Sequence, residues 1–362
     1  MKRRVRWRRA ARFDGVLQMN AFRFAGPFAF LAAVPISYGW VNSAPYIIAA
    51  ALFLLLLIAS RLPEPELTES DVSRLLPIFY IPLQLIVIGW AIGEVCGGRA
   101  NIAAFAGLAI AVGVCTGVFG VLAAHEMVHS RARWQHWFGA AMLTGMSYRH
   151  FRISHIYGHH RHAATERDSS TARLGESFYA FFARTLWGQF THAWRFEACR
   201  LRNARLPLLH NRVNQDVTVM LLIYALLWWG LGRRAAAFLA CESVVAMLVL
   251  ELFNYVAHYG LVRRANEPMA EHHSWNSSGA ANLLIFNMGR HSHHHRAPAL
   301  AYNSLRKAPR APELPAGYAG AILLALIPPL WRAVIHPRLD NLAAPMRESV
   351  YVDGDSPAAA MP

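Results

Sequence analysis

Histidine is the residue type in this sequence with the greatest capacity for chemistry, because neutral imidazole binds metal ions readily. The chain contains 18 histidines. Ten of them belong to four short motifs, HEMVH (125–129), HIYGHH (155–160), NYVAHYGL (254–261) and RHSHHH (290–295), and all of these except His293 are candidate ligands. The candidate metal-ligating residues are His125, His129, His155, His159, His160, His258, His291, His294 and His295.

The number of these histidines indicates more than one metal ion. In HEMVH the two imidazoles are four residues apart and therefore share one face of a helix. Nine imidazoles exceed the four ligands of a tetrahedral zinc site. They suit two iron ions with several nitrogen ligands each, and imidazole is a good ligand for iron. We therefore expect two iron ions as the cofactor.

Each motif has a simpler interpretation when it is taken alone. HExxH on a helix is typical of zinc proteases, in which Glu126 would be the base. A lone His258 is more often a packed side chain than a ligand. A membrane zinc protease would leave the other three motifs unexplained, and a metal transporter or storage protein would place its ligands along a path through the membrane.

The composition favours a membrane protein. Hydrophobic residues make up 55% of the chain and charged residues 16%, against ~25% charged in soluble domains. The net charge of +15 indicates Arg-rich loops rather than nucleic-acid binding, because no nucleic-acid-binding motif accompanies it. The four cysteines form no CxxC pair, so the chain carries no rubredoxin-like or zinc-ribbon element and no evident disulfide framework; they are Cys96, Cys115, Cys199 and Cys241.

Runs of apolar residues predict an all-α integral membrane protein. A bilayer core of ~30 Å needs ~20 such residues per helix. We expect six transmembrane helices, at 21–41, 45–60, 76–95, 102–124, 217–232 and 236–260. All four histidine motifs then lie at the same ends of these spans and can converge on one site.

The distribution of Arg predicts on which side of the membrane the histidine site lies. A basic arm at 1–20 and the Arg-rich segment 130–215 place both termini and the histidine site in the cytoplasm, although Arg233 and Arg234 would lie outside. We expect a bacterial inner-membrane protein with a membrane-embedded domain at 21–305. The C-terminal segment 306–362 would hold an interfacial helix around 317–335 and a disordered tail.

The four motifs together resemble those of the AlkB-type membrane alkane monooxygenases, within the superfamily of fatty acid desaturases and hydroxylases. That family carries HExxHK, EHxxGHH, NYxxHYG and RHSxHH in this order, and the resemblance covers roughly residues 20–305. The NYxxHYG element is the most specific, because desaturases generally lack it. HSWNS at 273–277 also resembles a stretch of the family.

The resemblance implies hydroxylation of a terminal methyl group with O2 at two irons. Electrons would come from rubredoxin and rubredoxin reductase, and the hydrocarbon substrate would enter from the membrane. A xylene-type monooxygenase acting on a benzylic methyl group, or a fatty acyl desaturase or hydroxylase, is the nearest alternative within the superfamily.

Residues beside the ligands are expected to orient them. The candidates are Glu126, Asn254, Tyr255, His273 and His293, with His150 as a further one. Three positions depart from the family: Ser154 and Ala257 stand where Glu is usual, and His293 stands where Asp is usual. Each departure removes a carboxylate that would orient a ligating imidazole. Ser130 also replaces the Lys that follows the first motif.

Overall fold

The computed structural model describes the chain except residues 1–22, 42–44, 65–72, 99, 265 and 353–362. The predicted basic arm and the end of the tail therefore fall outside the described residues. The described part is helical, and its one β-contact is an isolated bridge between Asn276 and Glu313. The expectation of an all-α fold is confirmed.

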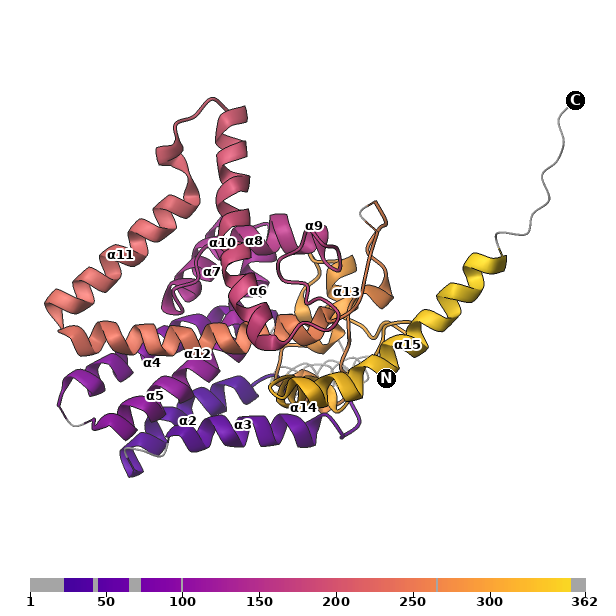
Figure 1. Cartoon of the computed structure of the whole chain (residues 1–362). Helices are drawn as coiled ribbons and strands as arrows, with labels where there is room; N and C mark the ends of the chain where they lie inside the picture. The colour runs from indigo at the N-terminus through magenta and orange to yellow at the C-terminus, as the bar shows by residue number, and fades with distance from the viewer. Residues whose placement is uncertain (1–22, 42–44, 65–72, 99, 265, 353–362) are drawn as a thin grey trace, which may run out of the picture.

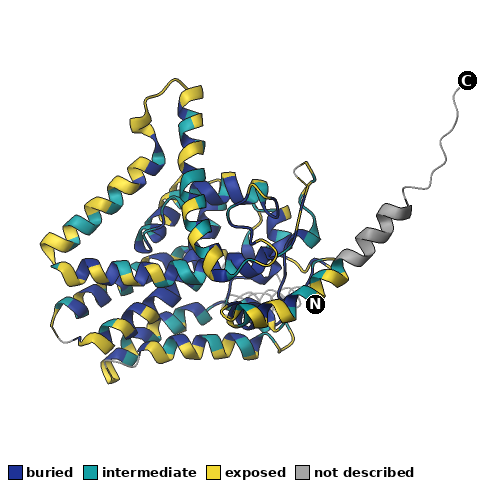
Figure 2. Cartoon of the chain, viewed as in Figure 1, coloured by how far each residue is buried: buried dark blue, intermediate teal, exposed yellow. Residues whose placement is uncertain are grey.

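Five stretches of helix lie side by side and form the bundle (Figure 1). They are α2 (Gly26–Trp40), α3 (Pro45–Ala59), α4 (Leu76–Cys96), the continuous stretch α5 (Ile102–Cys115), η2 (Thr116–Gly120) and α6 (Val121–His129), and α12 (Arg233–His258). The facing sides of these helices are buried, and many outward sides are exposed and apolar (Figure 2). Exposed apolar helix faces are the expected arrangement where lipid surrounds the protein.

Small residues allow two of these helices to approach closely. A Cβ on Gly113 would lie 2.6 Å from Cβ of Val245, and one on Gly117 would lie 2.7 Å from the carbonyl oxygen of Ala246. Real Cβ atoms do not come this close, so α12 can pack against α5 and η2 only because both positions are glycine. Small residues at this spacing are typical of packed membrane helices.

A helix occurs at each of the six predicted spans, and within the described residues three helices are long and apolar enough to cross a membrane. These three are Ser73–Cys96, Ile102–His129 and Arg233–His258. α3 is apolar but has 15 residues, which is ~22 Å of helix. α11 (Arg212–Gly230) covers the fifth predicted span without meeting the same criterion. The structure thus supports a membrane protein, while the number of spans remains a prediction.

A helical hairpin extends from the bundle. α10 (Phe178–Asn203) runs across the direction of α12, and α11 returns to the start of α12 (Figure 1). Glu197 of α10 joins the two arms, because it accepts hydrogen bonds from Arg200 and from Arg212 of α11. The middle of α11 exposes Leu221, Leu222 and Leu226.

The remaining elements are short, apart from the last helix. They are η1 (Ser73–Leu75), α7 (Arg133–Gly145), α8 (Phe151–Ser154), η3 (His155–His159), α9 (His160–His162), η4 (Leu208–His210), η5 (Glu271–His273), η6 (Ala280–Leu283), η7 (Met288–Arg290), α13 (His291–Arg296), η8 (Tyr302–Ser304), α14 (Gly317–Ala325) and α15 (Pro328–Val352). The segment predicted as an interfacial helix forms α14 and the start of α15, and α14 packs against α12 and α3.

Candidate metal centre

The histidine motifs lie on segments that meet at one end of the bundle (Figure 1). His125 and His129 occupy the last turns of α6, and His258 is the last residue of α12. The second motif occupies η3 and the start of α9, and the fourth occupies α13. A π-helical turn, η2, immediately precedes α6, and such turns are frequent at functional sites.

The nine imidazoles form two groups, in each of which the candidate ligand atoms lie within 4.8 Å of one another. The first group is His125, His129, His155, His160 and His294, and the second is His159, His258, His291 and His295. All four members of the second group are buried. The structure therefore brings together every histidine that the sequence marked as a candidate ligand.

In the second group the inward-facing nitrogens crowd together. Nε2 of His258 lies 3.1 Å from Nε2 of His291 and 3.2 Å from Nε2 of His295, and the last two atoms are 3.1 Å apart. Nε2 of His159 is buried and has no hydrogen-bond partner among the described residues. Three mutually close nitrogens cannot all be satisfied by sharing hydrogens in pairs, whereas one cation can accept all of their lone pairs.

Two hydrogen bonds determine which nitrogen faces inward. Nδ1 of His159 lies 2.8 Å from Oδ2 of Asp168, and Nδ1 of His258 lies 3.1 Å from the carbonyl oxygen of His273. Both partners are acceptors, so Nδ1 carries the hydrogen and Nε2 presents a lone pair. This is the arrangement found for metal-binding histidines.

The first group shows the same spacing. Nε2 of His155 lies 3.1 Å from Nε2 of His129 and 2.9 Å from Nε2 of His160, which is 3.1 Å from Nε2 of His294. Ligands ~2.1 Å from one ion and at right angles to each other are ~3.0 Å apart. Both groups therefore fit a metal ion.

Burial keeps the imidazoles of the first group neutral. Desolvation, reinforced by neighbouring histidines, lowers the pKa of His155, His160 and His294 well below the usual value. Neutral imidazole is the form that binds a metal ion. The site thus favours a metal complex over a cluster of protonated side chains.

Most of the residues expected beside the ligands bond elsewhere. Glu126 accepts a hydrogen bond from the backbone N–H of Tyr302, Tyr255 donates to the carbonyl oxygen of Glu176, and His293 accepts from the N–H of Arg306. The side chain of Asn254 donates to Glu251, and the ring of His150 packs edge-on against Tyr148 and Phe190. Among these candidates only His273 bonds a histidine of the two groups, through its backbone.

Two acidic residues connected to the site, one directly and one through other side chains, were missed by sequence reasoning. Asp168 contacts His159 and also accepts from the Thr171 hydroxyl. Although burial opposes the effect, His159, Thr171 and the N–H of Ser170 hold the pKa of Asp168 below its usual value. An acidic residue nine positions after His159 was the available signal, but a spacing outside the motif does not reveal a contact.

The second missed carboxylate belongs to Glu251, two turns before His258 on α12. It accepts hydrogen bonds from Gln189 at 2.7 Å and Tyr148 at 3.2 Å. The hydroxyl of Ser154 reaches the side-chain oxygen of the same Gln189 at 3.3 Å. Ser154, which stands where the family usually has Glu, is therefore connected through Gln189 to the buried carboxylate of Glu251.

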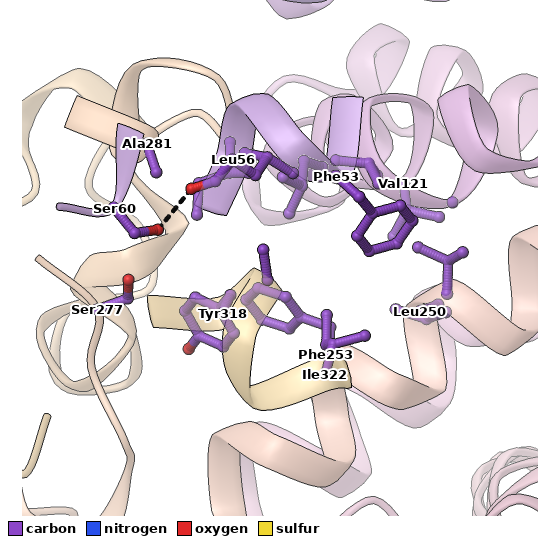
Figure 3. A pocket seen from close by; sticks show the side chains of 16 residues that line it. Phe53, Leu56, Ser60, Val121, Leu250, Phe253, Ser277, Ala281, Tyr318 and Ile322 are labelled. Atoms are coloured by element: carbon purple, nitrogen blue, oxygen red, sulfur yellow. Dashed lines mark hydrogen bonds between the residues drawn. The ribbon is translucent and has the colours of Figure 1, made fainter. Parts of the chain in front are cut away.

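An apolar pocket adjoins the histidine groups. Phe253 stacks on Tyr318 in its wall (Figure 3), with ring centroids 4.1 Å apart. The ring of Phe253 also lies 5.6 Å from that of His291. Hydroxyl groups occur at one end, at Ser60 and Ser277, and the rest of the lining is almost entirely hydrocarbon. The free space is about 60 Å³. Side chains of α3, η2, α6, α12 and α14 contribute to it.

Comparison with known proteins gives one consistent result. The fatty acid desaturase family matches residues 100–323. Alkane 1-monooxygenase 2 of Pseudomonas aeruginosa is 34% identical over 84% of this chain and 88% of its own length. Alkane 1-monooxygenase of Ectopseudomonas oleovorans is 34% identical over 80% of this chain and 74% of its own length.

A more distant match concerns a related activity. The hydroxylase component of xylene/toluene monooxygenase from Pseudomonas putida is 29% identical over 80% of each chain. The alkane relatives are more similar to this chain over comparable lengths. With its helical fold and converging histidines, the chain belongs to the alkane 1-monooxygenase family of membrane enzymes.

Proposed function

We propose that this protein hydroxylates the terminal methyl group of alkanes to primary alcohols with O2, at two iron ions held by the nine histidines. The observation that carries the proposal is the pair of imidazole groups directly beside an apolar pocket. Iron bound there would supply the redox chemistry that activates O2. The protein positions the methyl group and excludes water around it.

The histidine groups support two ions over one. Five imidazoles in one group and four in the other exceed the needs of a single zinc protease site. Glu126, which would be the protease base, is held by the N–H of Tyr302. The geometry thus supports a di-iron oxygenase and not a hydrolase.

The chemistry of the pocket suits a hydrocarbon substrate. No charged side chain lines it, and its polar groups are a few hydroxyls. Phe253 and Leu122 line the pocket, and Leu122 lies one helical turn before His125. A chain that enters between them would bring its end to the imidazoles.

The partners and location follow from charge and from the family. We infer that rubredoxin, reduced by rubredoxin reductase, supplies the electrons and docks on the histidine side, where Arg residues are abundant. An acidic electron carrier would be attracted to such a face. The abundance of Arg on this side also supports a bacterial inner-membrane location in which this side and both termini face the cytoplasm.

Whole-cell conversion tests the proposal. Cells expressing the protein with a rubredoxin and its reductase would receive n-alkanes, p-xylene and a saturated fatty acid, with products measured by gas chromatography and mass spectrometry. We expect primary alkanols, and we expect none from His294→Ala. His210→Ala, at the tip of the hairpin, is the matched control and should retain activity.

Other outcomes would contradict specific parts of the proposed function. Benzylic alcohols or unsaturated acids alone would assign the protein to a neighbouring activity. Full activity of His294→Ala would contradict the ligand assignment. Purified protein that contains zinc without iron would contradict the di-iron proposal.

A further inference from the structure

A groove of about 590 Å³, lined by none of the nine candidate ligands, lies between α7, the α8–η3 segment and the first turns of α11. Its lining combines basic, aromatic and aliphatic side chains. Arg133, which lies four residues after His129, belongs to this lining. The groove is therefore near the level at which the bundle helices end.

Positive charge in the groove exceeds negative charge. Four arginines line it, but the lining contains a single carboxylate, that of Asp216. Arg149 and Arg152 share this carboxylate, with N–O distances of 2.8–2.9 Å. Arg212 instead contacts Glu197, which lies behind the groove on α10 and also pairs with Arg200. An anionic ligand would find excess positive charge here.

Two hydrogen-bond donors in the groove lack acceptors. The Nε atoms of Arg152 and Arg212 are buried and have no hydrogen-bond partner among the described residues. Buried donors in native proteins are nearly always paired. A ligand with several oxygen acceptors and negative charge, such as a phosphate group, suits arginine side chains with unused donors, because it matches their fork of N–H groups.

The groove also offers apolar surface that continues along the membrane-exposed helix. Trp137 and Tyr157 stand at its sides, with Trp137 73% exposed. Val219 lies in the lining, and Leu222 and Leu226 extend the same side of α11, 57% and 71% exposed. Trp and Tyr are enriched where membrane meets water. A ligand that fits both parts has a phosphate head and a hydrocarbon chain.

We propose that this groove binds an anionic phospholipid, with its phosphate among the arginines and one acyl chain along α11. The proposal rests on the membrane topology described under the proposed function, which places the groove at the headgroup level. Basic pockets between membrane helices on the cytoplasmic side are suited to such headgroups. A zwitterionic lipid carries the phosphate without the net charge and should bind more weakly.

Lipid-dependent thermal stability of the purified, iron-loaded full chain in detergent tests the proposal. The probes are phosphatidylglycerol, phosphatidylcholine and inorganic phosphate, added separately. We expect phosphatidylglycerol to raise the melting temperature and the other two to leave it nearly unchanged. Arg133→Gln should weaken the apparent affinity for phosphatidylglycerol roughly fivefold, because one basic residue near a membrane surface contributes ~1 kcal/mol.

Arg131→Gln is the matched control. It removes the same charge from an exposed residue two positions away that does not line the groove, so its lipid affinity should equal that of the wild type. Equal affinities in the two variants, equal shifts with both lipids, or a full shift with inorganic phosphate would each overturn the proposal. So would discrimination between the variants by an acidic rubredoxin and not by the lipid, which would indicate a protein-docking surface.

Alcohol formation by the same preparations separates this proposal from the proposed function. Selective lipid binding with no alkane hydroxylation would contradict the proposed function but not the lipid-binding groove. Alkane hydroxylation without lipid selectivity would contradict the lipid-binding groove but not the proposed function.

Discussion

Single contacts decide how the candidate ligands are oriented. His159 and His258 each have one ring nitrogen occupied by an acceptor, Asp168 in the first case and a backbone carbonyl in the second. A backbone acceptor cannot be removed by substitution, but Asp168 can. This carboxylate also shows that the loss of acidic residues at positions 154, 257 and 293 has not left the centre without one.

Asp168→Asn should reduce metal occupancy and activity by about 10–100-fold. The amide keeps the size of the side chain but no longer stabilises the Nδ1–H of His159 by charge. Iron per protein, measured by mass spectrometry, and alkanol formation are the two readouts. Glu166→Gln, an exposed neighbour, should change neither. Unchanged iron content in Asp168→Asn would contradict an orienting role.

At the scale of elements, the close packing of α12 on η2 sets the distance between two parts of the centre. α12 ends in His258, and the stretch that includes η2 ends with His125 and His129. Any side chain between these helices would shift one histidine group relative to the other.

Gly117→Ala should lower both stability and activity. Its added methyl would meet the backbone of Ala246 at 2.7 Å, and overpacking of this kind costs about 1–3 kcal/mol. Gly93→Ala is the matched control, because nothing lies within 4 Å of a Cβ at that position of α4, and alanine there should be neutral or slightly stabilising. Thermal unfolding in detergent and alkanol formation would show the difference. Similar behaviour of the two variants would contradict the packing argument.

The hairpin of α10 and α11 should open in acid. Burial alone would raise the pKa of Glu197, but hydrogen bonds from Arg212 and Arg200 lower it to about 2, from a usual value near 4.5. A lowered folded-state pKa contributes stability above pH ~4.5 that is lost as the pH falls toward 2. The protection of residues 203–211 against hydrogen exchange, taken relative to the intrinsic exchange rate at each pH, should therefore fall across this range.

Glu197→Gln tests that assignment. The variant should show lower protection at neutral pH and little further loss of protection between pH 4.5 and 2. A wild-type hairpin whose protection stays constant in this window would contradict the role of the ion pairs.

For the whole molecule, the candidate metal centre joins segments that are far apart in the sequence. The histidines of the two groups span residues 125–295, and several lie on helices too short to be stable alone, such as α9 and α13. Ions that bind only the folded protein stabilise it. The centre is thus expected to hold the end of the bundle together.

Removal of iron by a chelator should lower the melting temperature and increase hydrogen exchange in 151–163 and 291–296. The bundle core, for example 104–115, should remain protected because apolar packing holds it. Readdition of iron should reverse both changes. An unchanged melting temperature after complete iron removal would show that the centre contributes nothing to stability.

Residue types and local spacing determined much of this protein in advance. The histidine motifs identified all nine members of the two groups, because metal ligands must be particular residues at spacings that a helix can present on one side. Hydropathy identified the positions of the bundle helices and of α11, because each must bury or expose apolar residues along its own length, but it did not identify α7 or α10 in the Arg-rich segment. Neither property depends on distant parts of the chain.

Only the tertiary structure decided how these residues are combined. His159 and His160 are adjacent but belong to different groups, as do His294 and His295, because neighbouring residues of a helix point about 100° apart. The contact between Asp168 and His159, the link from Ser154 to Glu251, and the closing of the pocket by α14 likewise depend on how separate segments pack. Such contacts arise from the arrangement of whole helices, which local spacing does not encode.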